Sequence, residues 1–281
     1  MTTAQKIIKY LAIAFAIFLI INIISGILWA IFGVSFIFGL QNWESDTKRE
    51  YSVITNYEYN DIDTLNREID TLDIDIKFSN LKIKTAEEFK VEGDSNYIKC
   101  RQDNRTIHIE EINHHWFNKN NSGELIIYMP KNLEFDKVKI CTGAGKIDID
   151  RFDTRKLSLE IGAGETHIRE LNVKDKADID GGAGKVTILS GIINDLDLDM
   201  GVGKVELKAK LTGSTDIEAG IGELDVKINA TKEDYKIKAS KGIGSITIDG
   251  EGISDDTIYG NGENYIKIDG GIGSIKVKFD K

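Results

Sequence analysis

Proline and cysteine are nearly absent from this chain of 281 residues. A single proline set against 27 glycines leaves almost every backbone N–H free to join a hydrogen-bonded ladder, while the chain can bend at many points. This combination favours β structure with tight corners. The two cysteines, Cys100 and Cys141, have neither metal-ligand spacing nor the density of a disulfide-stapled domain. We expect two unpaired thiols, with a single disulfide in an oxidising compartment as the alternative.

Basic residues are also fewer than acidic ones. The chain has 36 Lys and Arg residues against 46 Asp and Glu residues, which gives a formal net charge of -10. Phosphate binding requires the opposite field, so this balance argues against nucleic acid as a partner. A composition of 41% hydrophobic and 29% charged residues is typical of a folded protein and argues against disorder.

Residues 10–40 contain no Asp, Glu, Lys, Arg or His. A helix needs only about 20 apolar residues to cross a hydrocarbon core, and no short apolar region with a small-residue cleavage site is evident. We interpret this segment as an uncleaved, single-pass signal anchor, with a buried core helix as the alternative. Lys6 and Lys9 precede it and charges of mixed sign follow it, so the N-terminus is predicted to be cytoplasmic and the rest extracytoplasmic.

A Gly-x-Gly motif recurs seven times in the second half of the chain. The first glycines follow one another at steps of 19, 20, 19, 19, 22 and 29 residues. The motif glycines are Gly143 and Gly145, Gly162 and Gly164, Gly182 and Gly184, Gly201 and Gly203, Gly220 and Gly222, Gly242 and Gly244, and Gly271 and Gly273.

Apolar residues alternate with polar ones on both sides of each motif. In the first copy, Val138 and Ile140 precede the glycines, and Ile147 and Ile149 follow them. Each unit is therefore a strand, a glycine corner and a second strand. A unit of about 20 residues with one apolar face must stack on its neighbours to bury that face. The predicted fold is an all-β, single-domain parallel β-solenoid, with glycines at close-packed corners and the residue between them closing the end of the core.

The predicted organisation follows from these segments. Residues 1–40 form the cytoplasmic stub and anchor, 41–66 a linker, and 67–281 the solenoid, with irregular first turns at 67–135 and Gly-x-Gly repeats at 136–281. Residues 108–122 are polar and predict a loop or hairpin excursion. The step of 29 residues before the last motif predicts a protruding loop at 250–264.

The glycine motifs do not fit a nucleotide site. Gly143-Ala144-Gly145-Lys146 has Ile140 where a phosphate loop needs its first glycine, and Ile147 where it needs Ser or Thr. The third glycine of a dinucleotide fingerprint is also missing. Calcium-binding β-rolls are excluded because they repeat every nine residues and place Asp after the glycines. We therefore expect no nucleotide and no cofactor.

Carboxylates recur at two outward positions before the corners. Parallel stacking at about 4.8 Å would align these like charges, which repel unless they are solvated or bridged by cations. A solvated face is the main interpretation, and Asp180, Asp199 and Glu218 are weak cation-binding candidates. One position holds Glu160, Asp180, Asp199, Glu218 and Asp269, and the other holds Asp178, Asp197 and Asp216.

No catalytic residues are predicted. A glycan-cleaving β-helix enzyme would need converging carboxylates beside a repeated aromatic or basic cleft, and aromatic residues do not recur with the motif. Adjacent His114 and His115 lack a spaced third ligand, so no metal site is predicted there, and His167 is expected to be exposed. Glycan hydrolysis is retained only as a minor alternative.

The chain resembles the bacterial adhesin family that includes LiaG-like cell-envelope proteins. The resemblance rests on the anchor, the Leu72-Asp73-Ile74-Asp75-Ile76 strand, the Ile126-Ile127-Tyr128-Met129-Pro130 strand end and the serial Gly-x-Gly turns. It implies a non-enzymatic module at the cell membrane that binds a wall polymer or an envelope protein. The alternative is an accessory protein of envelope-stress signalling that acts through its anchor.

Overall fold

The computed structural model describes residues 52–56, 69–112 and 123–280. Apart from one turn of 3-10 helix at Lys232–Asp234, every regular element in these ranges is a β-strand. The predicted all-β solenoid is confirmed there. The predicted anchor at 10–40 lies outside the described residues, and none of the elements within them is a helix long and apolar enough to cross a membrane.

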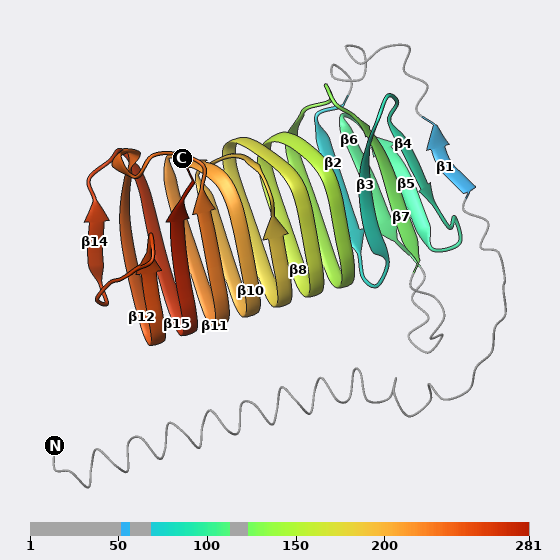
Figure 1. Ribbon diagram of the computed structural model, residues 1–281. Helices are drawn as coiled ribbons and strands as arrows, with labels where there is room; N and C mark the ends of the chain where they lie inside the picture. The colour runs from blue at the N-terminus through green and yellow to red at the C-terminus, as the bar shows by residue number, and fades with distance from the viewer. Residues whose placement is uncertain (1–51, 57–68, 113–122, 281) are drawn as a thin grey trace, which may run out of the picture. The chain divides into compact units, whose positions relative to one another are not determined.

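Successive turns of the chain stack as parallel rungs (Figure 1). β8 (Phe135–Ile188), β9 (Gly191–Asn194), β10 (Leu196–Thr212) and β11 (Ser214–Ile228) wind around one core, and β8 alone spans more than two turns. Each rung has a first strand, a Gly-x-Gly corner and a second strand. The rungs are in register, because Leu198 pairs with both Ile179 and Ile217.

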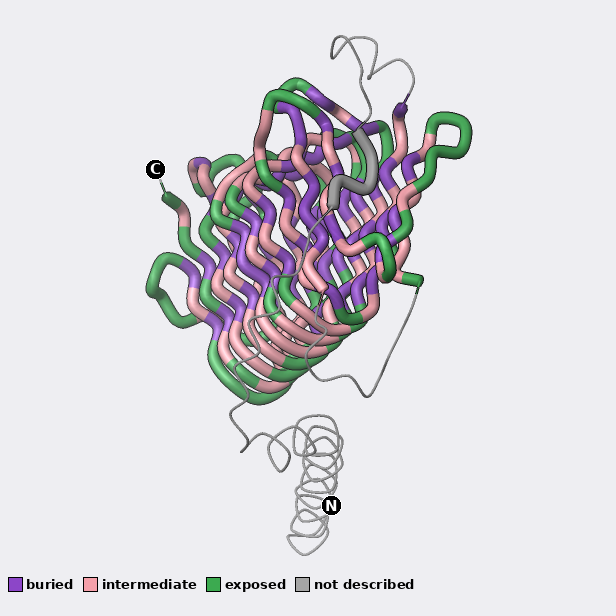
Figure 2. The backbone as a smooth tube through the Cα atoms, turned by 90° about the vertical axis from the view of Figure 1, so that its right-hand side faces the viewer, coloured by how far each residue is buried: buried purple, intermediate pink, exposed green. Residues whose placement is uncertain are grey.

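Aliphatic ladders fill the interior. Figure 2 shows buried positions alternating with outward ones along the stacked strands. Ile179, Leu198 and Ile217 form one ladder in the first strands, and each is at most 1% exposed. A matching ladder runs through the second strands. Burying each such side chain contributes about 1.5–3 kcal/mol relative to leaving it in water, so the solenoid is held mainly by these ladders.

The corners accept only glycine at both motif positions. At Gly222, φ is +150°, and a Cβ would lie 1.7 Å from the carbonyl oxygen of Gly203 on the preceding rung. At Gly220, a Cβ would lie 2.4 Å from the carbonyl oxygen of Gly201. The expectation that the middle residue closes the core is wrong, because Ile221 points outward and is 40% exposed. Tight backbone stacking leaves no room inside the corner for a side chain.

The C-terminal rungs depart from chain order. β15 (Asn264–Phe279) lies between β11 and β12 (Tyr235–Ile248) and pairs in parallel with both (Figure 1). Within β15, Ile268 pairs with Ile217 on one side and with Ala239 on the other. The outermost rung, β12, thus comes earlier in the sequence than β15, which occupies the position between β12 and β11.

The segment predicted as a loop, residues 250–264, contains two short strands. They are β13 (Glu251–Gly252) and β14 (Thr257–Gly260), and both pair antiparallel with β12. These strands occupy hydrogen-bonding positions along the outer edge of the last rung. They therefore limit further strand pairing at that end.

Irregular rungs at the N-terminal end also close with antiparallel strands. β2 and β3 stack on the first Gly-x-Gly rung, β6 and β7 pair outside them, and β4, β5 and β1 complete the edge. His108 lies in β6, so the predicted excursion begins later than residue 108. The bounds are β1 (Ser52–Asn56), β2 (Thr71–Ile76), β3 (Asn80–Ala86), β4 (Lys90–Gly93), β5 (Ile98–Asp103), β6 (Thr106–Glu111) and β7 (Glu124–Pro130).

The corner between β2 and β3 has no glycine and is held by a carboxylate. The backbone N–H groups of Lys77, Phe78 and Ser79 donate to Glu111 Oε2 over 2.6, 2.9 and 3.4 Å. The Ser79 hydroxyl donates to Glu111 Oε1 over 3.1 Å. Glu111 therefore satisfies donors that would otherwise lack a partner at this corner.

Neither cysteine forms a disulfide, as the main sequence interpretation expects. Cys100 and Cys141 are each half-buried. Burial is the main cause that raises the pKa of Cys141, with the nearby carboxylate of Glu160 adding to it. The Cys141 thiol is therefore not activated as a nucleophile by a lowered pKa.

Candidate functional site

Outward side chains of the first strands form an acidic face. The register places Asp199 between Asp180 and Glu218, and Glu218 next to Asp269. The second predicted row is also in register, since Asp197 lies between Asp178 and Asp216. Over β10, β11 and β15 this face presents five carboxylates and one lysine. They are Asp197, Asp199, Asp216, Glu218, Asp269 and Lys267.

Lys267 neutralises one end of the acidic face. The ligand oxygens of Asp216, Glu218 and Asp269 lie within 4.8 Å of one another, which would suit a metal ion. The Lys267 ammonium lies 3.1 Å from Asp216, 3.8 Å from Glu218 and 2.6 Å from Asp269. Its hydrogen bond is the main cause that lowers the pKa of Asp269. The lysine thus supplies the positive charge that a bound cation would supply.

Further along the same face, no lysine of the described residues forms an ion pair with Asp180 or Asp199. Partial burial, followed by the charges of Glu218, Asp197 and Asp180, raises the pKa of Asp199. A shallow hollow of about 480 Å³ opens beside them, with Glu160 also in its lining. Of the three predicted cation candidates, only Glu218 belongs to the close group around Lys267. Cation binding by Asp180, Asp199 and Glu218 stays a prediction.

The second strands of the same rungs carry the opposite balance. Their ion pairs are dense: hydrogen bonds from Lys204, then Lys185, lower the pKa of Glu206, and Lys276, then Lys204, lower the pKa of Glu223. The outward rows that pair across β10, β11 and β15 after the corner hold five lysines and three carboxylates. They are Lys204, Lys208, Lys227, Lys276, Lys278, Glu206, Glu223 and Asp225.

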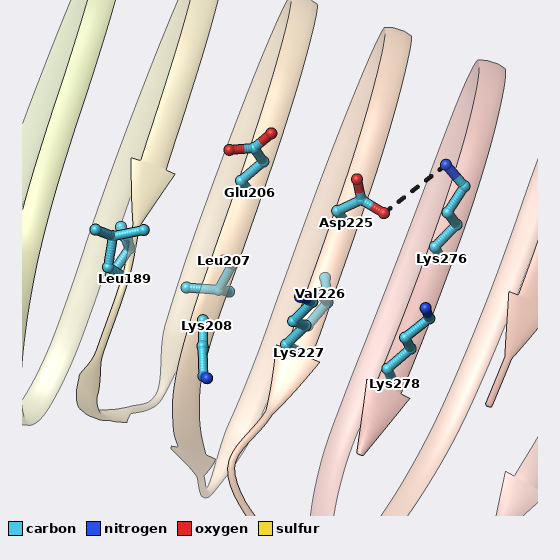
Figure 3. A pocket seen from close by; sticks show the side chains of 10 residues that line it. Leu189, Glu206, Leu207, Lys208, Asp225, Val226, Lys227, Lys276 and Lys278 are labelled. Atoms are coloured by element: carbon cyan, nitrogen blue, oxygen red, sulfur yellow. Dashed lines mark ion pairs between the residues drawn. The ribbon is translucent and has the colours of Figure 1, made fainter. Parts of the chain in front are cut away.

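A groove of about 490 Å³ runs across these second strands (Figure 3). Lys208, Lys227 and Lys278 form one wall, because Lys208 pairs with Lys227 and Lys227 with Lys278. We call these three residues the lysine row. Glu206, Asp225 and Lys276 form the other wall. Ile188, Leu207 and Val226 also line the groove, and Leu189 extends the lysine wall at one end.

The sequence interpretation missed the lysine row, although a signal was present. Each of its lysines is the fifth residue after the second glycine of a motif. Chain order would have placed Asp249, which follows Ile248 of β12, beside Lys227, because β12 would then stack on β11. The return of β15 instead brings Lys278 next to Lys227 and makes the row continuous.

Of the four histidines, His108 and His167 lie within the described residues. His114 and His115 lie outside the described residues. His167 is half-buried rather than fully exposed. His108 Nδ1 lies 3.1 Å from Asp73 on the neighbouring strand β2, in a contact between two N-terminal rungs. The two faces on either side of the corners are therefore the candidate functional surfaces of the part that the structure describes.

The solved structures that resemble this chain include three proteins of similar coverage. A "putative cell adhesion protein" from Clostridium sporogenes is 19% identical with a TM-score of 0.31, and covers 82% of this chain and 98% of its own. A "putative adhesin" from Bacteroides fragilis is 13% identical with a TM-score of 0.41, and covers 75% and 92%. A "putative lipid binding protein" from Parabacteroides distasonis is 13% identical with a TM-score of 0.29, and covers 76% and 93%.

No curated protein matches the chain in sequence. A family model described as Toastrack DUF4097 matches residues 62–258, which span all of the irregular first turns at 67–135 and six of the seven Gly-x-Gly corners. The match covers more than half of the chain. The protein therefore belongs to the Toastrack DUF4097 family.

Proposed function

We propose that the protein is a non-enzymatic surface module of the cell envelope that binds a linear wall polymer along its second strands. One observation carries the proposal: outward side chains of successive rungs align into straight rows with a regular spacing of about 4.8 Å. Such rows match a ligand that repeats along its length. The adhesin names of two structures and the resemblance to LiaG-like envelope proteins agree with this role.

The absence of catalysis is part of the proposal. Among the described residues, the carboxylates of the acidic face point outward in parallel rows, whereas hydrolysis of a glycan needs two carboxylates on opposite sides of one bond. Glycan turnover that disappears when Asp180, Asp199 and Glu218 are replaced by Asn or Gln would overturn this part. We expect no turnover in either protein.

The proposal also places the module at the membrane through residues 10–40. The support is the uncharged sequence of that segment and the lysines that precede it. The full chain should stay in the membrane pellet during alkaline carbonate extraction, and a chain without 10–40 should be released. Release of the full chain would contradict the anchor.

Polymer binding is tested by co-sedimentation of the full chain, in detergent micelles, with insoluble wall polymer from the cells that make it. We expect saturable sedimentation. Gly222→Ala, which disrupts the stacking of rungs, should reduce it, and Gly252→Ala should not, because a Cβ there meets nothing within 4 Å. A wild-type chain that remains in the supernatant would contradict the proposal.

A further inference from the structure

We propose that the groove beside the lysine row binds a linear polyanion, with its phosphate or carboxylate groups placed on Lys208, Lys227 and Lys278. The proposal rests on the proposed function, because it assigns a chemical class to the polymer. The positive charge of the lysine row is local, and it is not evident from the net charge of the chain, which is -10.

The spacing of the row is the first argument. Lys208, Lys227 and Lys278 lie on three neighbouring strands and recur every 4.8 Å or so along the solenoid axis. Each ammonium is a flexible point charge with three donors, so it can follow anionic groups whose repeat is somewhat longer than one rung. A polymer that runs along the groove meets all three lysines, whereas a single anion meets only one or two.

The availability of the row is the second argument. Lys227 and Lys278 are exposed, and no carboxylate of the described residues lies within ion-pair distance of either. By contrast, Lys276 on the opposite wall contacts Glu223 at 2.5 Å and Asp225 at 4.0 Å. Two of the three lysines in the row therefore form no ion pair with the part of the chain that is described.

The remaining lysine, Lys208, forms an ion pair with a carboxylate of the chain itself. Asp280 follows β15, and its carboxylate lies 3.0 Å from Lys208 Nζ. The backbone N–H of Asp280 donates to the carbonyl of Ile228 over 2.9 Å, which fixes the residue beside the row. The hydrogen bond from Lys208 is the main cause that lowers the pKa of Asp280, and the charge of Lys227 adds to it. A carboxylate is thus already seated at one end of the row.

The groove also has features that favour a chain over a compact ion. Leu189 lies at one end of the groove and is 44% exposed, so an apolar link between anionic groups can pack on it while the groups reach the lysines (Figure 3). Leu207 and Val226 face the core and are each 1% exposed, so they offer no such surface. The acidic face on the first strands repels the same ligand. Binding is therefore expected along one side of the corners only.

The test uses the full chain in detergent micelles and two defined probes, long-chain inorganic polyphosphate and poly-glutamate, with orthophosphate as the monomeric control. Lys227→Gln/Lys278→Gln is compared with Lys131→Gln/Lys137→Gln. This control removes the same charge from two exposed lysines that form no ion pair with the described residues. Asp280→Asn is the third variant, and affinity is measured over a series of salt concentrations.

We expect the wild type to bind at least one polymer, and orthophosphate far more weakly. The groove pair should weaken binding at least tenfold and lower the slope of log affinity against log salt by about 1–2, while the control pair changes neither by much. Asp280→Asn should strengthen binding about two- to fivefold, because it releases Lys208.

Equal weakening by the two pairs would overturn the proposal, because binding would then follow net charge. Groove-dependent binding of single-stranded DNA in preference to both polymers would also overturn it, because the ligand would then be a nucleic acid and not the envelope polymer to which the proposal assigns a chemical class. If neither polymer binds but wall polymer still sediments the chain, the groove proposal fails and the proposed function stands. If wall polymer does not sediment the chain either, both fail.

Discussion

The first and second strands of the same rungs share one core and one row of corners, yet their outer surfaces have opposite charge. In the outward rows that pair across β10, β11 and β15, the first strands present five carboxylates and one lysine, and the second strands present five lysines and three carboxylates. The interior of both is the same kind of aliphatic ladder. The stability of the core therefore does not depend on the charge of the outer rows, and their difference is what the proposed binding of a polyanion requires.

The order of the rungs decides how each face is composed. Because β15 lies between β11 and β12, Asp269 extends the carboxylate row next to Glu218, and Lys278 extends the lysine row next to Lys227. The same insertion places Lys267 beside Asp216, where it relieves the acidic face. One topological feature thus shapes both surfaces.

The largest expected effect comes from breaking the corner that divides the faces. Gly222→Ala should lower the free energy of unfolding by more than about 3 kcal/mol, because φ is +150° and the new Cβ would meet the Gly203 carbonyl oxygen at 1.7 Å. Gly252→Ala is the matched control and should be close to neutral. Urea unfolding of the full chain in micelles, followed by circular dichroism, measures both, and similar midpoints for the two variants would refute tight stacking at the corner.

The next largest effect on stability is expected at Lys267, which reduces the repulsion among the carboxylates of the acidic face. Lys267→Met removes the lysine that pairs with Asp216, Glu218 and Asp269, so these three carboxylates then repel one another. The control is Lys238→Met, which loses one exposed ion pair with Asp256. At neutral pH the fall in the urea midpoint should be several-fold larger for Lys267→Met than for Lys238→Met. The deficit should shrink when acid protonates the carboxylates. A deficit that is constant down to acidic pH would show that packing, and not charge, is responsible.

A smaller effect of opposite sign is expected at Asp199. Its folded pKa is raised, so its ionised form destabilises the native state, and this penalty grows as pH rises from the ordinary value of 3.8 through the folded pKa. Asp199→Asn should therefore raise the free energy of unfolding by about 0.5 kcal/mol at neutral pH and by less in acid. A lower free energy of unfolding than in the wild type at neutral pH would contradict the origin of the shift.

Glu206 on the second strands should behave in the reverse way. Its folded pKa is lowered by Lys204 and Lys185, so its stabilisation is present above the ordinary value of 4.5 and is lost as pH falls through the folded pKa. Glu206→Gln should cost at most about 0.5 kcal/mol at neutral pH, because the pairs are partly exposed, and nothing in strong acid. If Asp199→Asn and Glu206→Gln shift stability with the same sign, the two faces do not differ as described.

The regular rungs could be predicted from the sequence because their cause is local. Apolar alternation marks the ladders, and the two glycines mark a corner where a Cβ would strike the neighbouring backbone. Alignment of Asp180, Asp199 and Glu218 also followed from spacing alone. The outward position of Ile221 did not, because an apolar residue between two glycines suggests burial, whereas the stacked corner has no interior space for it.

The order of the last rungs could not be predicted in this way. Steps of 22 and 29 residues between motifs show that extra chain is present, but they do not show that β13 and β14 cover β12 or that β15 returns beneath it. Hydrophobic periodicity is the same in either order. The continuity of Lys227 with Lys278 depends on this non-local pairing, so the groove became visible only in the fold.

The most direct test of the account is the position of β15, since both faces depend on it. In a chain whose Cys100 and Cys141 are replaced by Ser, Asp225→Cys/Lys276→Cys joins neighbours in register, about 4.8 Å apart. Asp225→Cys/Thr247→Cys places cysteines two rungs apart, where the Cα atoms are about 10 Å from each other and too distant for a disulfide. Under mild oxidation, non-reducing electrophoresis should show an intramolecular disulfide in the first variant only. A disulfide between positions 225 and 247, with none between 225 and 276, would contradict the account.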